Sequence, residues 1–118
     1  MLEFSKIRLE DTGRSRNGRK IMRLRSPLTV KMRAYLLYVI PAGFESDGLS
    51  RPFFLGRKWE SWGRYSGPAL LHDYLLEETA LPKWQVDWLF MGALRSCGVS
   101  ALESGLFWLA VRTKRSRL

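Results

Sequence analysis

The sequence contains few residues that bind transition metals or form covalent cross-links, with one cysteine and one histidine among 118 residues. The single cysteine, Cys97, has no partner for a disulfide within the chain. Zinc fingers and knuckles need four Cys or His ligands, so both are excluded. No apolar run reaches the roughly 18 residues of a membrane helix, and the N-terminus has no apolar signal-peptide core. We therefore expect a protein made in the cytoplasm, without a membrane span.

Acidic residues are also scarce, with 11 Asp and Glu against 20 Lys and Arg, which gives a net charge of +9. This balance favours anionic partners such as nucleic acid, an envelope polyanion or an acidic protein face. The basic residues concentrate in residues 14–25 and in the last seven positions. These segments are either solvated loops or an anion-binding surface. The candidate anion-binding residues are Arg14, Arg16, Arg19, Lys20, Arg112, Lys114, Arg115 and Arg117.

The first half of the chain has the pattern of β-structure. Residues 28–40, LTVKMRAYLLYVI, alternate at first and then become apolar throughout, which predicts a strand entering the core. Residues 3–9 or 20–25 are its candidate partner strands, because Gly and Asn between them suit a hairpin turn. Proline and glycine then predict a long shaped loop over residues 41–66, and a loop of that length in a small domain is often functional.

The second half of the chain has the pattern of three helices within residues 67–112. Pro68 suits the first turn of a helix that ends near Thr79, and Pro82 opens a second helix that Gly98 stops. Residues 100–103, SALE, form a capping box that starts a third helix. This third helix is expected to bury a stripe of apolar residues, namely Leu102, Leu106, Leu109 and Ala110.

Together these patterns predict a single α+β domain over residues 1–118. Its β-rich N-terminal part, residues 1–40, would form a hairpin or small antiparallel sheet packed on the three C-terminal helices. The loop 41–66 would join the two parts, and residues 113–118 would form a basic tail. No internal repeat is visible.

Four polar residues stand apart from the general surface charge. His72 and Asp73 flank the apolar stripe of the first predicted helix and point to different sides of it. Asp87 has Trp84, Phe90 and other apolar neighbours at helical spacing, so we expect a buried carboxylate with a partner. Asp47 lies in the glycine-containing loop.

Two interpretations of these residues stay open, and we favour the structural one, in which they form a polar network that fixes one packing of a small core. In the other, Asp47, His72 and Asp87 hold a divalent metal such as zinc, and Asp73 and Asp87 serve as catalytic acids or bases. A metal-free catalytic site is a further version of this second interpretation. Trp84, Trp88 and Trp108 are interpreted as core or interface residues, in preference to a ligand cage.

The motifs PAGFESD, GRYSGPALLHDYLL, VDWLFMGALRSCGV and FWLAVR occur in this order. In combination they resemble a family of small uncharacterised proteins encoded by tailed bacteriophages and prophages, over roughly residues 35–112. The chain departs from that pattern at Arg51, Leu76 and Val86. The resemblance implies a phage or prophage origin and brings no established chemistry with it.

Two functions follow as hypotheses. The first is a phage structural or assembly protein associated with the virion, around the tail or connector, with other phage structural proteins, nucleic acid or an envelope polyanion as partners. The second is a metal-assisted hydrolase that acts on the bacterial envelope, for example on peptidoglycan. The first predicts a location in the virion or the host cytoplasm. The second predicts that Asp47, His72 and Asp87 converge on one cleft.

Overall fold

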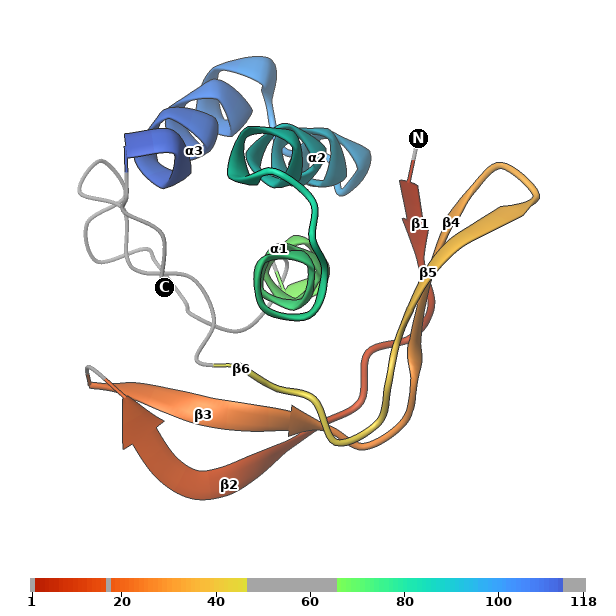
Figure 1. Ribbon diagram of the computed structural model, residues 1–118, viewed down its shortest axis with the longest axis vertical. Helices are drawn as coiled ribbons and strands as arrows, with labels where there is room; N and C mark the ends of the chain where they lie inside the picture. The colour runs from red at the N-terminus through yellow and green to blue at the C-terminus, as the bar shows by residue number, and fades with distance from the viewer. Residues whose placement is uncertain (1, 17, 47–65, 114–118) are drawn as a thin grey trace.

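The computed structural model describes residues 2–16, 18–46 and 66–113, without the side chains of residues 19, 110 and 113. Six strands in two small antiparallel sheets are followed by three helices, so the predicted α+β arrangement is confirmed (Figure 1). The elements in chain order are β1 (Leu2–Phe4), β2 (Leu9–Arg16), β3 (Arg19–Leu24), β4 (Leu28–Met32), β5 (Tyr35–Ile40), β6 (Glu45–Ser46), α1 (Ser66–Glu78), α2 (Lys83–Ser96) and α3 (Ala101–Thr113).

The strands form two separate sheets, one with the order β1-β4-β5 and the other with the order β2-β3-β6. Both segments predicted as partner strands are in sheets, but only the first pairs with β4, through Phe4 opposite Val30. The second segment belongs to β3, which pairs with β2 and β6 instead.

The prediction of one strand over residues 28–40 is wrong, because this segment is a hairpin of β4 and β5. Met32 pairs with Tyr35, which leaves a two-residue turn. Arg33 makes the turn with a φ of 57°, in the left-handed region that side chains other than glycine rarely adopt. The expectation that this segment enters the core holds for Leu28, Val30 and Ile40 only, since most of β5 is exposed.

The helices begin and end close to the predicted positions, and the local chemistry explains why. Pro68 lies in the first turn of α1, and Pro82 is the N-cap of α2. At the other end of α2, the N–H of Val99 donates to Leu94 and that of Gly98 donates to Arg95, which together form a Schellman motif. One of the two hydrogen bonds of the predicted capping box of α3 is present, because Ser100 Oγ accepts the N–H of Glu103 at 3.2 Å.

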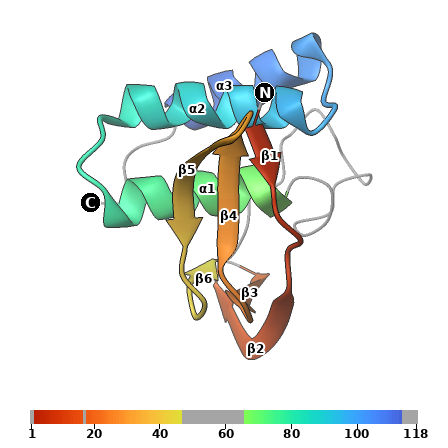
Figure 2. The same ribbon diagram turned by 90° about the vertical axis from the view of Figure 1, so that its right-hand side faces the viewer.

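The core lies between the β1-β4-β5 sheet and the helices, with α1 in the middle. In Figure 2, β4 and β5 pass in front of α1, and α2 runs above it. One cluster joins the sheet to α1 and α2, and includes Leu28, Val30, Leu70 and Leu75. A second cluster joins α1 and α2 to α3. Because α1 has neighbours on both sides, nine of its thirteen residues are buried.

The buried face of α3 differs from the predicted stripe. Leu102 is 76% exposed and Leu109 is 53% exposed, whereas Ser104 and Phe107 are buried. Phe107 packs edge to face on Phe90 of α2, at 6.3 Å between ring centroids. The large aromatic contact between α2 and α3 therefore sets the rotation of α3 in place of its leucines. Among the described helices, none is both long enough and apolar enough to cross a membrane.

Candidate functional site

His72 and Asp73 are adjacent in α1 and point to different neighbours, as the sequence predicted. Successive helical residues are rotated by about 100°, so one side chain of the pair faces α2 and the other faces β6. His72 is 7% exposed and Asp73 is 3% exposed. A buried polar group is costly unless it has a hydrogen-bond partner, and both residues have one.

Asp87 of α2 is the centre of a buried polar network that joins all three helices, and its exposure is 0%. Its Oδ1 lies 2.7 Å from Nε2 of His72 on α1. Its Oδ2 accepts a hydrogen bond from Nζ of Lys83 at 2.7 Å and one from the Arg112 guanidinium on α3 at 3.4 Å. The predicted burial of Asp87 is confirmed. Both carboxylate oxygens are thus engaged by donors of the protein itself.

The surroundings of this network are apolar on one side and cationic on the other. The His72 imidazole packs on Phe90, with 4.9 Å between ring centroids. Nζ of Lys83 also donates to the backbone carbonyl of Val111 at 2.5 Å, so Lys83 ties the start of α2 to the end of α3. Two cationic groups therefore share the negative charge of one carboxylate, which compensates for its removal from water.

Asp73 belongs to a second contact, separate from Asp87. Ser46 Oγ of β6 donates a hydrogen bond to Asp73 Oδ2, and both residues are buried. This contact attaches the β2-β3-β6 sheet to α1. Asp73 therefore serves as a tether between the two halves of the fold.

The structure brings together only some of the residues predicted for a site. His72 and Asp87 are in direct contact, whereas Asp73 bonds to Ser46. Asp47, the third predicted metal ligand, lies outside the described residues. Within the described parts of the chain, no group of three or more His, Cys, Asp or Glu side chains could hold a metal ion.

Sequence reasoning missed Lys83, although a signal was present. Lys83 precedes Asp87 by four positions on one helix, a spacing at which opposite charges meet. It also missed that Arg112, predicted to bind anions, reaches Asp87. The side chain of Arg112 is 37% exposed, so it contacts both the network and solvent.

The β2-β3 hairpin carries the described part of the basic surface, and Glu45 neutralises part of it. The Arg14 guanidinium donates to both oxygens of Glu45, at 2.6 and 2.7 Å, and Arg23 donates to Glu45 and Glu10. The hydrogen bonds from Arg14 and Arg23 lower the pKa of Glu45, and Arg14 has the larger effect. In turn, the hydrogen bonds to Glu45 and Glu10 raise the pKa of Arg23. Glu45 was not predicted to have any role.

The other predicted anion-binding residues differ in whether an acidic side chain lies close to them. Nζ of Lys20 lies 3.6 Å from Oδ2 of Asp11. Arg16 is exposed and forms no ion pair with the described residues. The side chain of Arg19 is not described, and Lys114, Arg115 and Arg117 lie outside the described residues.

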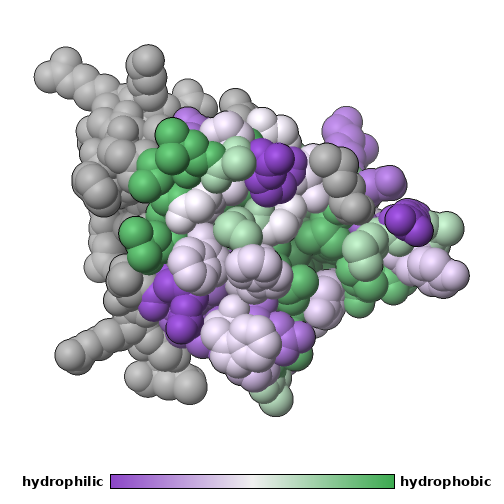
Figure 3. All heavy atoms as spheres, turned by 90° about the horizontal axis from the view of Figure 1, so that it is seen from above, coloured by the Kyte–Doolittle hydropathy of each residue, from purple (hydrophilic) through white to green (hydrophobic). Residues whose placement is uncertain are grey.

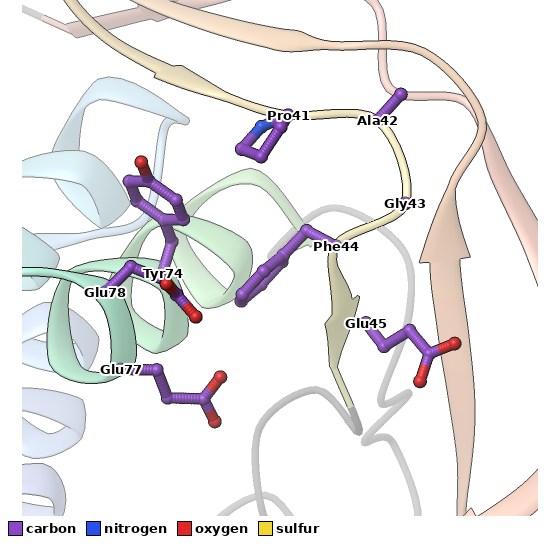
Figure 4. Close-up of a pocket in the computed structure, with 8 residues that line it drawn as sticks. All are labelled: Pro41, Ala42, Gly43, Phe44, Glu45, Tyr74, Glu77 and Glu78. Carbon is purple, nitrogen blue, oxygen red and sulfur yellow. The ribbon is translucent and has the colours of Figure 1, made fainter.

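A pocket of about 530 Å³ lies between α1 and the segment that leads into β6. Figure 4 shows Phe44 and Tyr74 side by side at its centre, and their rings are 5.6 Å apart in an edge-to-face arrangement. Its polar lining is acidic, from Glu45, Glu77 and Glu78. His72 and Asp87 do not line it, so the polar network and the pocket are different places.

A sequence model of a family described as "Protein of unknown function (DUF1353)" covers residues 22–111. No curated protein and no solved structure matches the chain.

Proposed function

This chain belongs to the DUF1353 family of proteins of unknown function, and we propose that it is a small phage-encoded structural or assembly protein. In this proposal the protein is associated with the virion, in the tail or connector region, and binds an anionic partner. In this role it acts by binding its partners through its surface.

The observation that carries this proposal is the state of Asp87. A catalytic carboxylate needs an oxygen that can reach a substrate, a water or a metal ion. Asp87 is 0% exposed, and its oxygens accept from His72, Lys83 and Arg112. Such an arrangement fixes the positions of three helices relative to one another, which is the task of a polar network in a small core.

The charge of the molecule supports an anionic partner. The net charge is +9, and Arg16 on the β2-β3 hairpin is exposed with no ion pair to any described residue. Phage origin is supported by the order of the short motifs from PAGFESD to FWLAVR, which resembles that of phage and prophage proteins. Packaged nucleic acid, the host envelope and acidic phage proteins all offer negative charge to such a surface.

The proposal is tested first on particles. Particles made by the phage or prophage that encodes the chain are purified on a density gradient and analysed by mass spectrometry. We expect the protein at a fixed stoichiometry that survives repeated purification. Its absence from particles and from assembly intermediates would overturn the virion role.

A second experiment tests the anionic partner with double-stranded DNA as the probe. Binding is measured from low to physiological salt for wild-type protein, Arg16→Ala and Arg14→Ala. Each lost phosphate contact lowers the salt slope by about 0.9. We expect Arg16→Ala to lower it and Arg14→Ala to change it less, because Glu45 already neutralises Arg14. Equal, salt-independent binding by all three proteins would contradict this expectation.

We also propose an alternative function, a metal-assisted hydrolase acting on the bacterial envelope. The favouring observation is the 2.7 Å contact between His72 and Asp87, since a carboxylate often orients a metal-binding imidazole in this way. In this version His72 is a ligand and Asp47 supplies a carboxylate, whereas Asp87, predicted from the sequence as a third ligand, holds the imidazole ring. About one tightly bound zinc ion per chain in the purified protein, lost in His72→Ala, would support it. A metal-free protein that is inactive on peptidoglycan would exclude it.

A further inference from the structure

The end of the β4-β5 hairpin, residues 31–39, projects from the body of the molecule, and we call it the β4-β5 finger. Figure 1 shows its turn standing away from the three helices, and Figure 3 shows hydrophobic and hydrophilic spheres side by side on the projecting part at the right. The finger combines an apolar sequence with an exposed position.

The finger exposes apolar side chains that a small protein normally buries. Tyr35 is 74% exposed, Leu36 is 54% exposed, and Met32 and Val39 are each 44% exposed. Met32 lies opposite Tyr35 and Lys31 lies opposite Leu36, so the exposed apolar side chains occupy both faces of the hairpin. Exposed apolar groups gathered on one projecting hairpin indicate an interaction site.

The backbone of the finger also favours an interaction, because β5 is an edge strand of its sheet. In the part of the chain that the structure describes, β5 pairs with β4 on one side and with no strand on the other. An edge strand presents a row of N–H and C=O groups that can accept a further strand. Strand addition of this kind joins many domains to extended partner segments.

The charge of the finger indicates what kind of segment would fit. Lys31 and Arg33 are exposed at its end, and residues 28–40 contain no acid. Arg33 holds a φ of 57°, which glycine would adopt more easily. The turn therefore has arginine at a position where the backbone conformation favours glycine.

We propose that β5 receives an extended segment of another protein as an added strand, with acidic residues of that segment beside Lys31 and Arg33. This proposal rests on the proposed function and deepens it, since it adds an acidic protein segment as a partner and gives the place where that segment binds. The apolar side chains of the finger would contact alternate side chains of the added strand.

Two other occupants fit the finger less well. Insertion into a membrane would carry the backbone groups at the edge of β5 into hydrocarbon, which offers them no hydrogen-bond partner. Pairing with a second copy would bring two chains of +9 together. It would also oppose two edges that each contain a bulge, since the β4-β5 register shifts between Val30 and Lys31. Bulges of this kind disfavour edge-to-edge pairing of identical strands.

The test uses full-length protein and a nine-residue probe peptide, Asp-Asp-Val-Thr-Val-Thr-Val-Asp-Asp. Two matched peptides have lysine in place of each aspartate, or N-methylated backbone amides that cannot donate to β5. Amide chemical shifts locate binding, and isothermal titration measures affinity. We expect shifts at Tyr35–Ile40, binding at least about tenfold weaker with lysines, which corresponds to about 1.4 kcal/mol, and no binding of the N-methylated peptide.

A pair of protein variants separates the finger from general surface effects. Leu36→Asp replaces an apolar group with a charge that repels the acidic segment, and Leu102→Asp makes the same replacement at an exposed site on α3. Circular dichroism and thermal unfolding verify that both are folded. We expect Leu36→Asp to bind the acidic peptide about tenfold more weakly and Leu102→Asp to bind it like wild type.

Several results would overturn the proposal. For the peptide, these results are a lack of binding, chemical-shift changes confined to other elements, or equal binding of the lysine peptide. For the other occupants, they are concentration-dependent dimers, or binding to anionic phosphatidylserine vesicles, that Leu36→Asp abolishes. These measurements do not depend on the particle experiment. Protein present in particles without peptide binding would refute the finger alone, and peptide binding without particle association would refute only the virion role.

Discussion

At the scale of single residues, the buried contacts of Asp87 predict a large effect on stability. Removing one partner of a buried ionic network leaves the other charges in the core without compensation. In Asp87→Ala the side chains of His72 and Lys83 lose their common acceptor. We expect the free energy of unfolding to fall by about 3–5 kcal/mol, as measured by urea denaturation.

The control for this prediction is Glu78→Ala, which removes an exposed acid from the same helical half of the molecule. Its effect should stay within about 0.5 kcal/mol. A loss in Asp87→Ala no larger than that of the control would show that the network contributes nothing to folding. In that case the structural interpretation of Asp87 would have to be abandoned.

Glu45 gives a residue-scale prediction about pH. The hydrogen bonds from Arg14 and Arg23 lower the pKa of Glu45 below its ordinary value of 4.5. Its contribution to stability is therefore present above about pH 4.5 and is lost as the pH falls through the lower pKa of the folded state. We expect wild-type protein to lose more stability below pH 4.5 than Glu45→Gln does.

The measurement is an NMR titration of the Glu45 side-chain carboxyl carbon, alongside unfolding at each pH. Added salt should move the midpoint back toward 4.5, because the pair is exposed and ions screen it. A midpoint at or above 4.5 in low salt would contradict the prediction.

Sequence reasoning could predict part of this network and not the rest. The burial of Asp87 followed from its apolar neighbours at helical spacing, and the contact with Lys83 was accessible from the four-residue interval. The contacts with His72 and Arg112 join three helices. They depend on how α1, α2 and α3 pack, which a single sequence does not specify.

At the scale of elements, the end of α2 offers a matched pair of glycines. Gly98 has a φ of 86° and completes the Schellman motif, whereas Gly92 lies within the helix with open space where a Cβ would stand. Alanine at position 98 is strained, and alanine at position 92 restricts the unfolded chain without strain. The same substitution should therefore have opposite signs.

We expect Gly98→Ala to lower the free energy of unfolding by about 1 kcal/mol and Gly92→Ala to raise it by about 0.5–1 kcal/mol. Thermal and urea unfolding of both variants measure the difference. Two changes of the same sign would show that the motif does not set the end of α2.

The helices were predicted well and the strands less so, for reasons visible in individual elements. Pro68, Pro82, Gly98 and Ser100 act locally, so their sequence positions determine where helices begin and end. The β4-β5 turn has no such marker, because it uses Arg33 and Ala34 where glycine or asparagine would identify a hairpin. The sequence pattern could not predict the exposure of Leu102, because the contact between Phe107 and Phe90 sets the rotation of α3.

At the scale of the whole molecule, stability is unevenly distributed. The core lies between the β1-β4-β5 sheet and the helices, while the far half of the β2-β3 hairpin is exposed. Regions with few buried contacts open locally, without unfolding of the rest. We expect native-state hydrogen exchange to be much faster at Ser15 and Lys20 than at Val30, which belongs to the core cluster.

Denaturant dependence adds a control to this measurement. Exchange at Val30 should follow the global unfolding equilibrium, and exchange at Ser15 should be almost insensitive to low denaturant, since a local opening exposes little surface. Equal protection across both sites would mean that the hairpin and the core unfold as one unit.

The hydrogen bond from the Leu2 N–H to Ser96 Oγ at 2.8 Å joins residues 94 positions apart. During synthesis the N-terminal strand emerges from the ribosome long before α2 does. At about 5–20 residues per second, the partner of Leu2 follows roughly 5–20 seconds later. For part of that interval β1 and the core residues of β4 are displayed on the nascent chain, before the helices that cover them have been made. β5 is also synthesised before the helices, so we expect its edge to be able to pair with another strand before the rest of the domain has folded.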